Sequence, residues 1–361
     1  MAYDVVIVGA GPAGLAAACK IKQTNPAYSV CVLEKGSEVG AHILSGAVFE
    51  PTALNELFPN WQSMSAPLNT QVTDDHLLLL QEQKQIRVPG IFAPKTMKNH
   101  GNYIISLGNF CRWLATQAEN LGVEIFPGFS AAEILYDEND QVMGIATGDM
   151  GLGKAGEKKD SYMQGMELHA KFTLFAEGCR GHLGKQLINK YQLDKGKDPQ
   201  HYGLGIKELW KIPADQHQPG LVVHSAGWPL SESDTLGGGF LYHLEDNQVA
   251  VGLITNLSYS NPHLSPYDEF QRYKQHPSIK QYLQGGERIT YGARAITKGG
   301  LQSQPKMSFP GGLLIGDDAG TLNFAKIKGS HTAMKSGMIA AETVCNALDQ
   351  AEHNSDLTTY A

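Results

Sequence analysis

The chain has 361 residues, of which 42% are hydrophobic and 18% charged, and its formal net charge is −7. This size and composition indicate a soluble globular protein that divides into two domains. The negative charge gives no support for nucleic-acid binding. Nothing approaches 18 consecutive apolar residues, so we expect no membrane-spanning helix. The N-terminus reads directly as a strand, and we expect no signal or transit peptide.

The cysteines and histidines are scattered along the sequence. None of the five cysteines forms a CxxC pair, and the 13 histidines lack the spacing of metal ligands. Zinc and iron–sulfur sites need clustered ligands. We therefore expect free thiols and no metal site. The cysteines are Cys19, Cys31, Cys111, Cys179 and Cys345.

The first apolar run covers residues 3–8, and a glycine-rich turn follows it directly. Gly9, Gly11 and Gly14 stand in the spacing GxGxxG and lead into a helix of small residues. In such a turn the first glycine permits the tight bend, the second lets a pyrophosphate approach the backbone, and the third lets helix and strand pack closely. The positive end of the helix dipole favours the phosphates.

A second apolar run, at residues 29–33, ends in Glu34. A carboxylate at about this distance from the glycines accepts hydrogen bonds from ribose hydroxyls. Strand, glycine turn, helix, strand and acid together predict a dinucleotide site, to which we add the neighbouring Lys35.

Residues 41–48 form a small, partly apolar segment that includes Ser45 and Gly46. Such a segment is equally consistent with two roles: it could lie beside a bound ring system, or it could be a connection that is packed within the protein.

The remaining elements alternate between helical and strand-like patterns. Their order predicts an α/β fold with an antiparallel meander inserted after a βαβ unit, an exposed hairpin at 148–165, and a strand-rich second region. We expect strands at 77–80, 85–88, 123–126, 131–136, 141–147, 166–176, 201–206, 220–224, 239–243, 249–254 and 312–317, and helices at 107–122, 266–276 and 329–348.

Two late segments extend the expected ligand site. Gly316 and Asp317 end a buried strand, where a carboxylate can bind the ribityl hydroxyls of a flavin; NAD has no ribityl chain. Gly329, Ser330 and His331 begin a helix whose N-terminus would favour a reduced, anionic flavin ring. Each segment alone is also consistent with a plain strand end or helix cap. Together with the glycine turn they predict FAD.

Several longer stretches resemble the electron-transfer flavoprotein–ubiquinone oxidoreductase family. The resemblance runs from residue 3 to about residue 348. Nitrogen-fixation flavoproteins and geranylgeranyl reductases share the cofactor motifs but resemble the chain less between 200 and 300. The stretches that carry the resemblance are GAHILSGA (40–47), NHGNYI (99–104), FAEGCRGHL (175–183), GGFLYH (238–243), YGARA (291–295) and KIKGSHTAMKSG (326–337).

The resemblance implies a glutathione-reductase-like, Rossmann-type FAD domain and a discontinuous α+β quinone-binding domain. The implied division assigns 1–70, 101–185 and 300–361 to the FAD domain and 71–100 and 186–299 to the quinone domain. It also implies that the backbone of Gly237 and Gly238 contacts the quinone head group. From the residues alone, this pair reads as a flexible turn before the strand at Phe240.

The implied activity is transfer of electrons from reduced electron-transfer flavoprotein to ubiquinone. The implied location is the surface of the inner membrane, on the cytoplasmic side in a bacterium or the matrix side in a mitochondrion. The loop at 90–101, with Ile91 and Phe92 beside lysines, suits such a surface. Apolar residues of 41–58 are expected to contribute.

The chain departs from the family pattern at two places. Asp317 and Asp318 stand where the family usually has a non-acidic pair. The family's iron–sulfur domain, with its four cysteine ligands for a 4Fe-4S cluster, follows the closing helix, and the chain stops at Ala361. We therefore expect the cluster domain to be absent. The alternatives are a flavin monooxygenase or geranylgeranyl-reductase-like enzyme, and a non-catalytic FAD-binding fragment.

Overall fold

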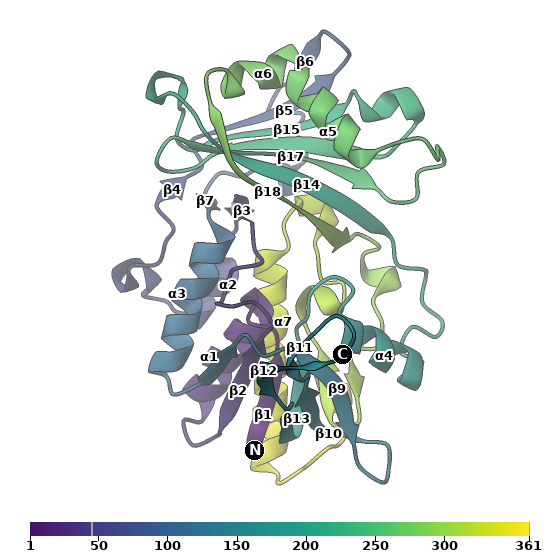
Figure 1. Ribbon diagram of the computed structural model, residues 1–361. Helices are drawn as coiled ribbons and strands as arrows, with labels where there is room; N and C mark the ends of the chain where they lie inside the picture. The colour runs from purple at the N-terminus through teal and green to yellow at the C-terminus, as the bar shows by residue number, and fades with distance from the viewer. Residues whose placement is uncertain (45, 361) are drawn as a thin grey trace.

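The protein consists of two parts stacked end to end. The computed structural model describes residues 1–44 and 46–360. An eight-stranded sheet forms the core of the lower part in Figure 1, and a seven-stranded sheet lies across the upper part.

The lower sheet has a parallel centre. Its strands run in the order β19-β20-β13-β1-β2-β8, while β10 pairs with β13 and β9 with β10. The side chains of β1 are buried from Val5 to Val8, as is typical of a parallel strand that is covered on both faces. The bounds are β1 Ala2–Val8, β2 Val30–Glu34, β8 Glu124–Pro127, β9 Ala131–Tyr136, β10 Val142–Thr147, β13 Glu167–Phe175, β19 Ser308–Phe309 and β20 Gly312–Leu314.

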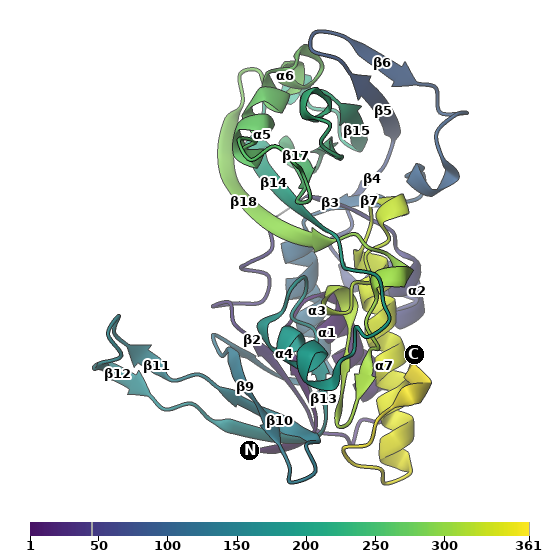
Figure 2. The same ribbon diagram turned by 90° about the vertical axis from the view of Figure 1, so that its right-hand side faces the viewer.

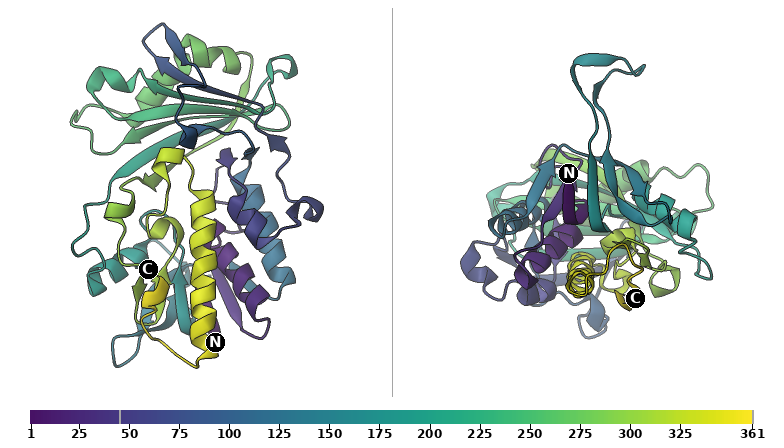
Figure 3. Two further views of the ribbon diagram at one scale, coloured as in Figure 1. Left: turned by 180° about the vertical axis from the view of Figure 1, so that it is seen from behind. Right: turned by 90° about the horizontal axis from the view of Figure 1, so that it is seen from below.

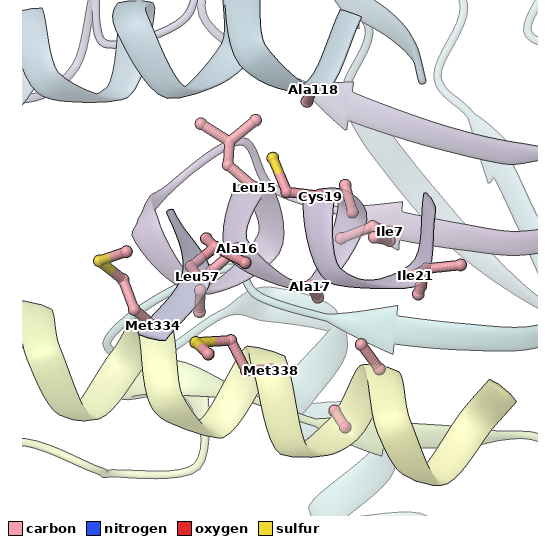
Figure 4. Packing of buried hydrophobic residues seen from close by; sticks show 14 of the residues in the cluster. Ile7, Leu15, Ala16, Ala17, Cys19, Ile21, Leu57, Ala118, Met334 and Met338 are labelled. Carbon is pink, nitrogen blue, oxygen red and sulfur yellow. The ribbon is translucent and has the colours of Figure 1, made fainter. Parts of the chain in front are cut away.

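Helix α1 (Pro12–Thr24) packs between α3 (Leu107–Asn120) and α7 (Ser330–Asp349) on one face of this sheet (Figures 3 and 4). Small residues let α1 and α7 approach closely, because a Cβ added at Gly337 would collide with the carbonyl oxygen of Ala13. The methionines of α7 fill the space beside the α1 alanines. This packing fixes the N-terminal ends of α1 and α7 relative to one another.

The remaining elements of the lower part flank this core. Helix α2 (Thr52–Leu57) packs beside α7, and α4 (His182–Tyr191) packs near β9. Strands β11 (Met150–Leu152) and β12 (Lys158–Met163) form a separate hairpin that projects from the molecule in Figure 2. The exposed hairpin predicted for this region is confirmed.

The upper sheet runs in the order β18-β14-β17-β16-β15-β5-β6. Helices α5 (Pro266–Gln275) and α6 (Pro277–Leu283) pack on its outer face, against a core that includes Phe270 and Tyr273. The bounds are β5 Asp74–Leu80, β6 Gln85–Val88, β14 Tyr202–Lys211, β15 Leu221–Gly227, β16 Gly237–His243, β17 Gln248–Asn256 and β18 Glu287–Thr297.

A small sheet joins the two parts. It consists of β3 (Ala47–Phe49), β7 (Tyr103–Ile105) and β4 (Thr70–Gln71). Val48 and Ile104 from this sheet share an apolar cluster with residues of the upper sheet. Short 3-10 helices are η1 Trp61–Met64, η2 Lys95–Met97, η3 Ala214–Gln216, η4 Leu230–Ser233, η5 Leu301–Ser303, η6 Gly316–Asp318, η7 Phe324–Lys326 and η8 Thr358–Tyr360.

The sequence does not predict β18, α4 or α6. β18 is the edge strand of its sheet and is largely exposed, so it lacks the alternation of a half-buried strand. Strand β16 begins at Gly237, two residues earlier than expected, and the strand expected at 312–317 ends at Leu314. Among the described residues, no helix is long and apolar enough to cross a membrane.

Candidate functional site

The glycine turn lies between the end of β1 and the start of α1. Gly9 has φ +108°, and a Cβ added there would lie 2.5 Å from the carbonyl oxygen of Ala176, so only glycine fits. A Cβ at Gly14 would collide with the carbonyl oxygen of Gly9. A Cβ at Gly11, in contrast, would meet no described atom within 4 Å. Gly11 therefore borders open space at the N-terminus of α1, as a cradle for a pyrophosphate requires.

Glu34 ends β2 directly beside this turn. Its carboxylate accepts hydrogen bonds from the backbone N–H of Ala10 (3.1 Å) and of Gly36 (2.7 Å). These bonds hold the side chain against the glycine turn before any ligand is present. Lys35 is exposed next to it.

Gly316 brings the second predicted segment to the same place. A Cβ added at Gly316 would lie 2.7 Å from Cβ of Ala13, in the first turn of α1, and the Gly316 N–H donates to Ser336 Oγ at 2.8 Å. The starts of α1 and η6 and the body of α7 therefore meet, which brings the predicted segments of Gly11 and Gly316 to one place.

Asp317 connects this site to the upper sheet. Its carboxylate accepts a hydrogen bond from the hydroxyl of Thr297 and a longer one, at 3.5 Å, from the backbone N–H of the same residue, at the end of β18. Burial raises the pKa of Asp317. The side chain expected to bind ribityl hydroxyls thus already has a partner in the upper part.

Asp318 points elsewhere, toward α4. A Cβ added at Gly181 would lie 2.8 Å from Oδ1 of Asp318, and Oδ2 has no hydrogen-bond partner in the described part of the chain. Burial first, and then the charge of Glu177, raise the pKa of Asp318 well above its usual value. Glu177 in turn accepts from the N–H groups of Leu183 (3.0 Å) and Gly184 (2.8 Å) at the start of α4.

The N-terminus of α7 carries the third predicted segment. Gly329 precedes the helix, and a Cβ added there would lie 2.7 Å from Leu322. Ser330 begins the helix, and His331 follows with Nε2 3.9 Å from Glu50 Oε2. Nδ1 of His331 is buried and lacks a partner within residues 1–44 and 46–360. Burial lowers the pKa of this histidine.

Leu44 and Gly46, which precede β3, contact the upper sheet. Ser45 lies outside the described residues. Gly46 has φ +94°, and a Cβ there would collide with Cβ of Ala250 on β17. Its carbonyl oxygen accepts a hydrogen bond from Lys207 Nζ of β14 at 3.1 Å. Leu44 lies against Gly292 of β18. Leu44 and Gly46 are therefore positioned between the two parts.

Gly237 and Gly238 lie within β16, paired with Thr255 and Ile254 of β17. The prediction of a flexible turn at this pair, made from the residues alone, is wrong. A Cβ at Gly237 would collide with the carbonyl oxygen of Ile254, and one at Gly238 would lie 2.7 Å from the carbonyl oxygen of Ser225. Close strand packing alone therefore requires glycine at both positions.

Strand pairing shows where this pair lies in the upper sheet relative to Thr297, the partner of Asp317. Gly237 pairs with Thr255, Thr255 with Leu204, and Leu204 with Ala295 of β18, two residues before Thr297. Three strand spacings amount to about 14 Å. The glycine pair is thus on the end of the upper sheet that faces η6.

The loop between β6 and β7 exposes two large apolar side chains. Ile91 is 82% exposed and Phe92 75% exposed. A pocket of about 340 Å³ opens beside this loop, and its charged lining residues are Lys95, Lys98, Lys326 and Glu50, with His100. The expectation that 41–58 adds apolar surface is wrong, because Phe49, Leu54 and Phe58 are buried in the core.

Sequence reasoning missed Lys207 and Glu177. Lys207 follows glycines at positions 203 and 205 of strand β14. A lysine that comes after two closely spaced glycines inside a strand is the signal that could have revealed it. Among the described residues, no group of three His, Cys, Asp or Glu side chains could hold a metal ion.

Comparison with known proteins identifies the family. A family model described as the ubiquinone-binding region of ETF-QO matches residues 202–296, and one described as an NAD(P)-binding Rossmann-like domain matches residues 7–62. The electron transfer flavoprotein-ubiquinone oxidoreductase of Pseudomonas aeruginosa is 66% identical over 367 residues, which cover 100% of this chain. The chain belongs to the electron transfer flavoprotein-ubiquinone oxidoreductase family. The mitochondrial member from Bos taurus is 53% identical over 368 residues, which cover 99% of this chain.

The relatives are longer than this chain. It spans 66% of the length of the Pseudomonas aeruginosa family member and 59% of the Bos taurus member.

Solved structures of several proteins share the fold. A geranylgeranyl bacteriochlorophyll reductase-like protein from Thermoplasma acidophilum has a TM-score of 0.75 at 18% identity, covering 99% of this chain and 82% of that chain. The flavin-dependent brominase Bmp2 has a TM-score of 0.69 at 16% identity, and the match covers 100% of this chain and 82% of the brominase chain. The predicted α/β fold with a Rossmann-like domain and a separate quinone-binding region is confirmed.

Proposed function

We propose that the chain binds FAD and passes electrons from reduced electron-transfer flavoprotein to ubiquinone at a membrane surface. The observation that carries the proposal is the open cradle at Gly11, adjoined by Gly316, in a chain that belongs to this oxidoreductase family. FAD, when bound, supplies a ring that accepts and releases electrons.

In this proposal the residues of the lower part hold the two halves of the cofactor. Gly11 and the N-terminus of α1 bind the pyrophosphate, and Glu34 binds the adenosine ribose. Asp317 faces the ribityl chain, and the N-terminus of α7 stabilises negative charge on the ring. Gly46 lies beside the ring. Each position agrees with the meeting of α1, η6 and α7.

The first test of the proposal is the identity of the bound cofactor. The purified protein should be yellow, and heating should release FAD and not FMN, as chromatography would show. A colourless protein that takes up no FAD on refolding would contradict the proposal.

We propose the domain division stated above, with 71–100 and 186–299 as the quinone part. It is supported by the pairing of β5 with β15, which places residues 74–88 in the same sheet as β14–β18. In this part the quinone head group binds near Gly237 and Gly238. Leu236, which is 69% exposed directly before them, offers an apolar contact for the quinone.

Leu236→Ser tests the quinone site better than a substitution of either glycine, because a side chain at the glycines would disturb the sheet. It should weaken binding of a short-chain ubiquinone analogue several-fold without changing FAD content. Leu301→Ser, at a side chain that is 76% exposed on the lower part, is the matched control. Equal affinity of both variants for the quinone would remove Leu236 from the site.

We propose that the loop with Ile91 and Phe92 inserts into the membrane interface as a peripheral anchor. The two apolar side chains stand beside Lys95 and Lys98, which suit anionic head groups. Ile91→Ser with Phe92→Ser should release most of the protein from vesicles of anionic lipid in a sedimentation assay. Ile289→Ser, at an exposed position of β18, is the control. Unchanged sedimentation of the double variant would contradict the anchor.

The cysteines of this chain are not arranged for a cluster. Four of the five are buried, and they lie apart in the described structure as free thiols. The 361-residue polypeptide alone should therefore show no iron–sulfur signal by electron paramagnetic resonance. Since the family resemblance places electron entry at such a cluster, this polypeptide should oxidise reduced electron-transfer flavoprotein slowly. Fast turnover with that donor would show that electrons can reach the flavin without a cluster.

A further inference from the structure

Lys207 stands in a gap on the inner face of the upper sheet. Its neighbour on β17 is Gly252, and its neighbour on β18 is Gly292, so no side chain flanks it on either adjacent strand. The ring of Phe240 covers Gly252, since a Cβ added at Gly252 would collide with it. The long side chain of Lys207 is therefore directed toward the segment before β3 and the lower part.

Among the described residues, the ammonium group of Lys207 has one hydrogen-bond partner, the carbonyl oxygen of Gly46 at 3.1 Å. An ammonium has three donors, so two remain unused. Lys207 forms no ion pair with any carboxylate in residues 1–44 and 46–360. Burial lowers its pKa to about 8, as desolvation does for a cation without a nearby countercharge.

Lys274 of helix α5, which packs on the outer face of the same sheet, shows the contrasting arrangement. Its side chain is buried, and its Nζ lies 2.9 and 2.8 Å from the two carboxylate oxygens of Glu208. Its charge is thus compensated within the protein. In the part of the chain that the structure describes, such compensation is present at Lys274 and absent at Lys207.

We propose that Lys207 supplies a positive charge to the flavin ring and stabilises the negative charge that the ring gains on reduction. This inference rests on the proposed binding of FAD. Gly46 bonds Lys207, Leu44 lies against Gly292, and further along β18 Thr297 bonds Asp317 beside Gly316. A cofactor that extends from the Gly11 cradle past Asp317 would place its ring under this part of the sheet. The unused donors of Lys207 then meet the electron-rich oxygens of the ring.

The test compares variants of the FAD-loaded protein by the midpoint potential of the flavin and by its affinity for sulfite. Sulfite adds to the oxidised ring and leaves it anionic, so its affinity reports a nearby positive charge. Lys207→Met should shift the equilibrium between oxidised and reduced flavin at least tenfold toward the oxidised form. This shift lowers the midpoint potential by about 30 mV for a two-electron couple. It should weaken sulfite binding by a similar factor. Lys207→Arg, which keeps the charge, should restore most of both.

Lys274→Met is the matched control, because it removes a buried lysine that packs on the other face of the same sheet and whose charge is already paired. It should lower the melting temperature and leave the potential and the sulfite affinity unchanged. Lys207→Gln takes the place of the methionine variant if the latter does not fold.

Two results would overturn the inference. Lys207→Met or Lys207→Gln with an unchanged potential and unchanged sulfite affinity would show that Lys207 only holds Gly46 in place. A shift that Lys207→Arg does not restore would show that the charge is not the cause. Failure of the unchanged protein to bind FAD would instead contradict the proposed function, so the two failures are distinguishable.

Discussion

The glycines of the first turn and those of β16 look alike in the sequence and differ in what surrounds them. A side chain at Gly11 would enter open space in the described structure, whereas one at Gly237 or Gly238 would meet the backbone of a neighbouring strand. Gly11 also has φ −83°, which any residue can adopt. Neither packing nor backbone strain explains glycine at this position, and the space for a ligand does.

The comparison shows which kind of argument each region supports. At the first turn, structure and family point independently to a ligand beside Gly11. At β16, the family resemblance alone assigns a quinone to the glycines, because sheet packing already accounts for them. The same substitution should therefore have opposite consequences in the two regions.

The largest effect is expected for Gly11→Val. The side chain would occupy the pyrophosphate position and should lower FAD affinity by a factor of about 100 or more, by analogy with the loss of several charge-assisted hydrogen bonds. The stability of the FAD-free protein should change by about 1 kcal/mol or less, as is usual for substitutions at a helix N-cap. Absorbance titration with FAD and chemical denaturation measure the two quantities. If the variant kept its affinity for FAD, this would contradict the claim that the space beside Gly11 holds the pyrophosphate.

The reverse pattern is expected for Gly237→Val. Overpacking against the β17 backbone and Leu230 should lower the free energy of unfolding by about 1–3 kcal/mol. The folded fraction should still bind FAD with unchanged affinity, because the Gly11 cradle is in the other part. Denaturation curves and FAD titration of the same sample check this. A fully stable variant would show that β16 tolerates a side chain there.

Acid should destabilise the upper sheet through His224 and His243. Burial lowers the pKa of each to about 4, below the ordinary 6.5. Between these values the unfolded chain binds more protons, so the free energy of unfolding should fall as the pH falls from about 6.5 to about 4. The loss is up to about 3 kcal/mol for each histidine.

Denaturation of the FAD-free protein at several pH values measures this loss. His224→Gln should flatten the pH dependence, while His201→Gln, at an exposed position, should leave it unchanged. An equally steep dependence in the His224→Gln variant would contradict the assignment.

Local patterns predicted the lower part well. The run from β1 through Gly9, Gly11 and Gly14 to Glu34 is contiguous, and each residue acts on its near neighbours. The sequence does not reveal that Asp317 bonds Thr297, or that Gly46 bonds Lys207, because these contacts join residues 20 and 161 positions apart. The edge strand β18 escaped prediction because it is exposed on most of its length.

The most direct test of the central claim is reoxidation of the bound flavin by a quinone. The FAD-loaded protein is reduced chemically without oxygen and mixed with a short-chain ubiquinone analogue, while absorbance follows the flavin. The account predicts rapid, saturable reoxidation that Leu236→Ser slows and Leu301→Ser does not. A reduced flavin that the quinone leaves unchanged, in a protein that consumes NADPH instead, would contradict it and favour the monooxygenase or reductase alternative.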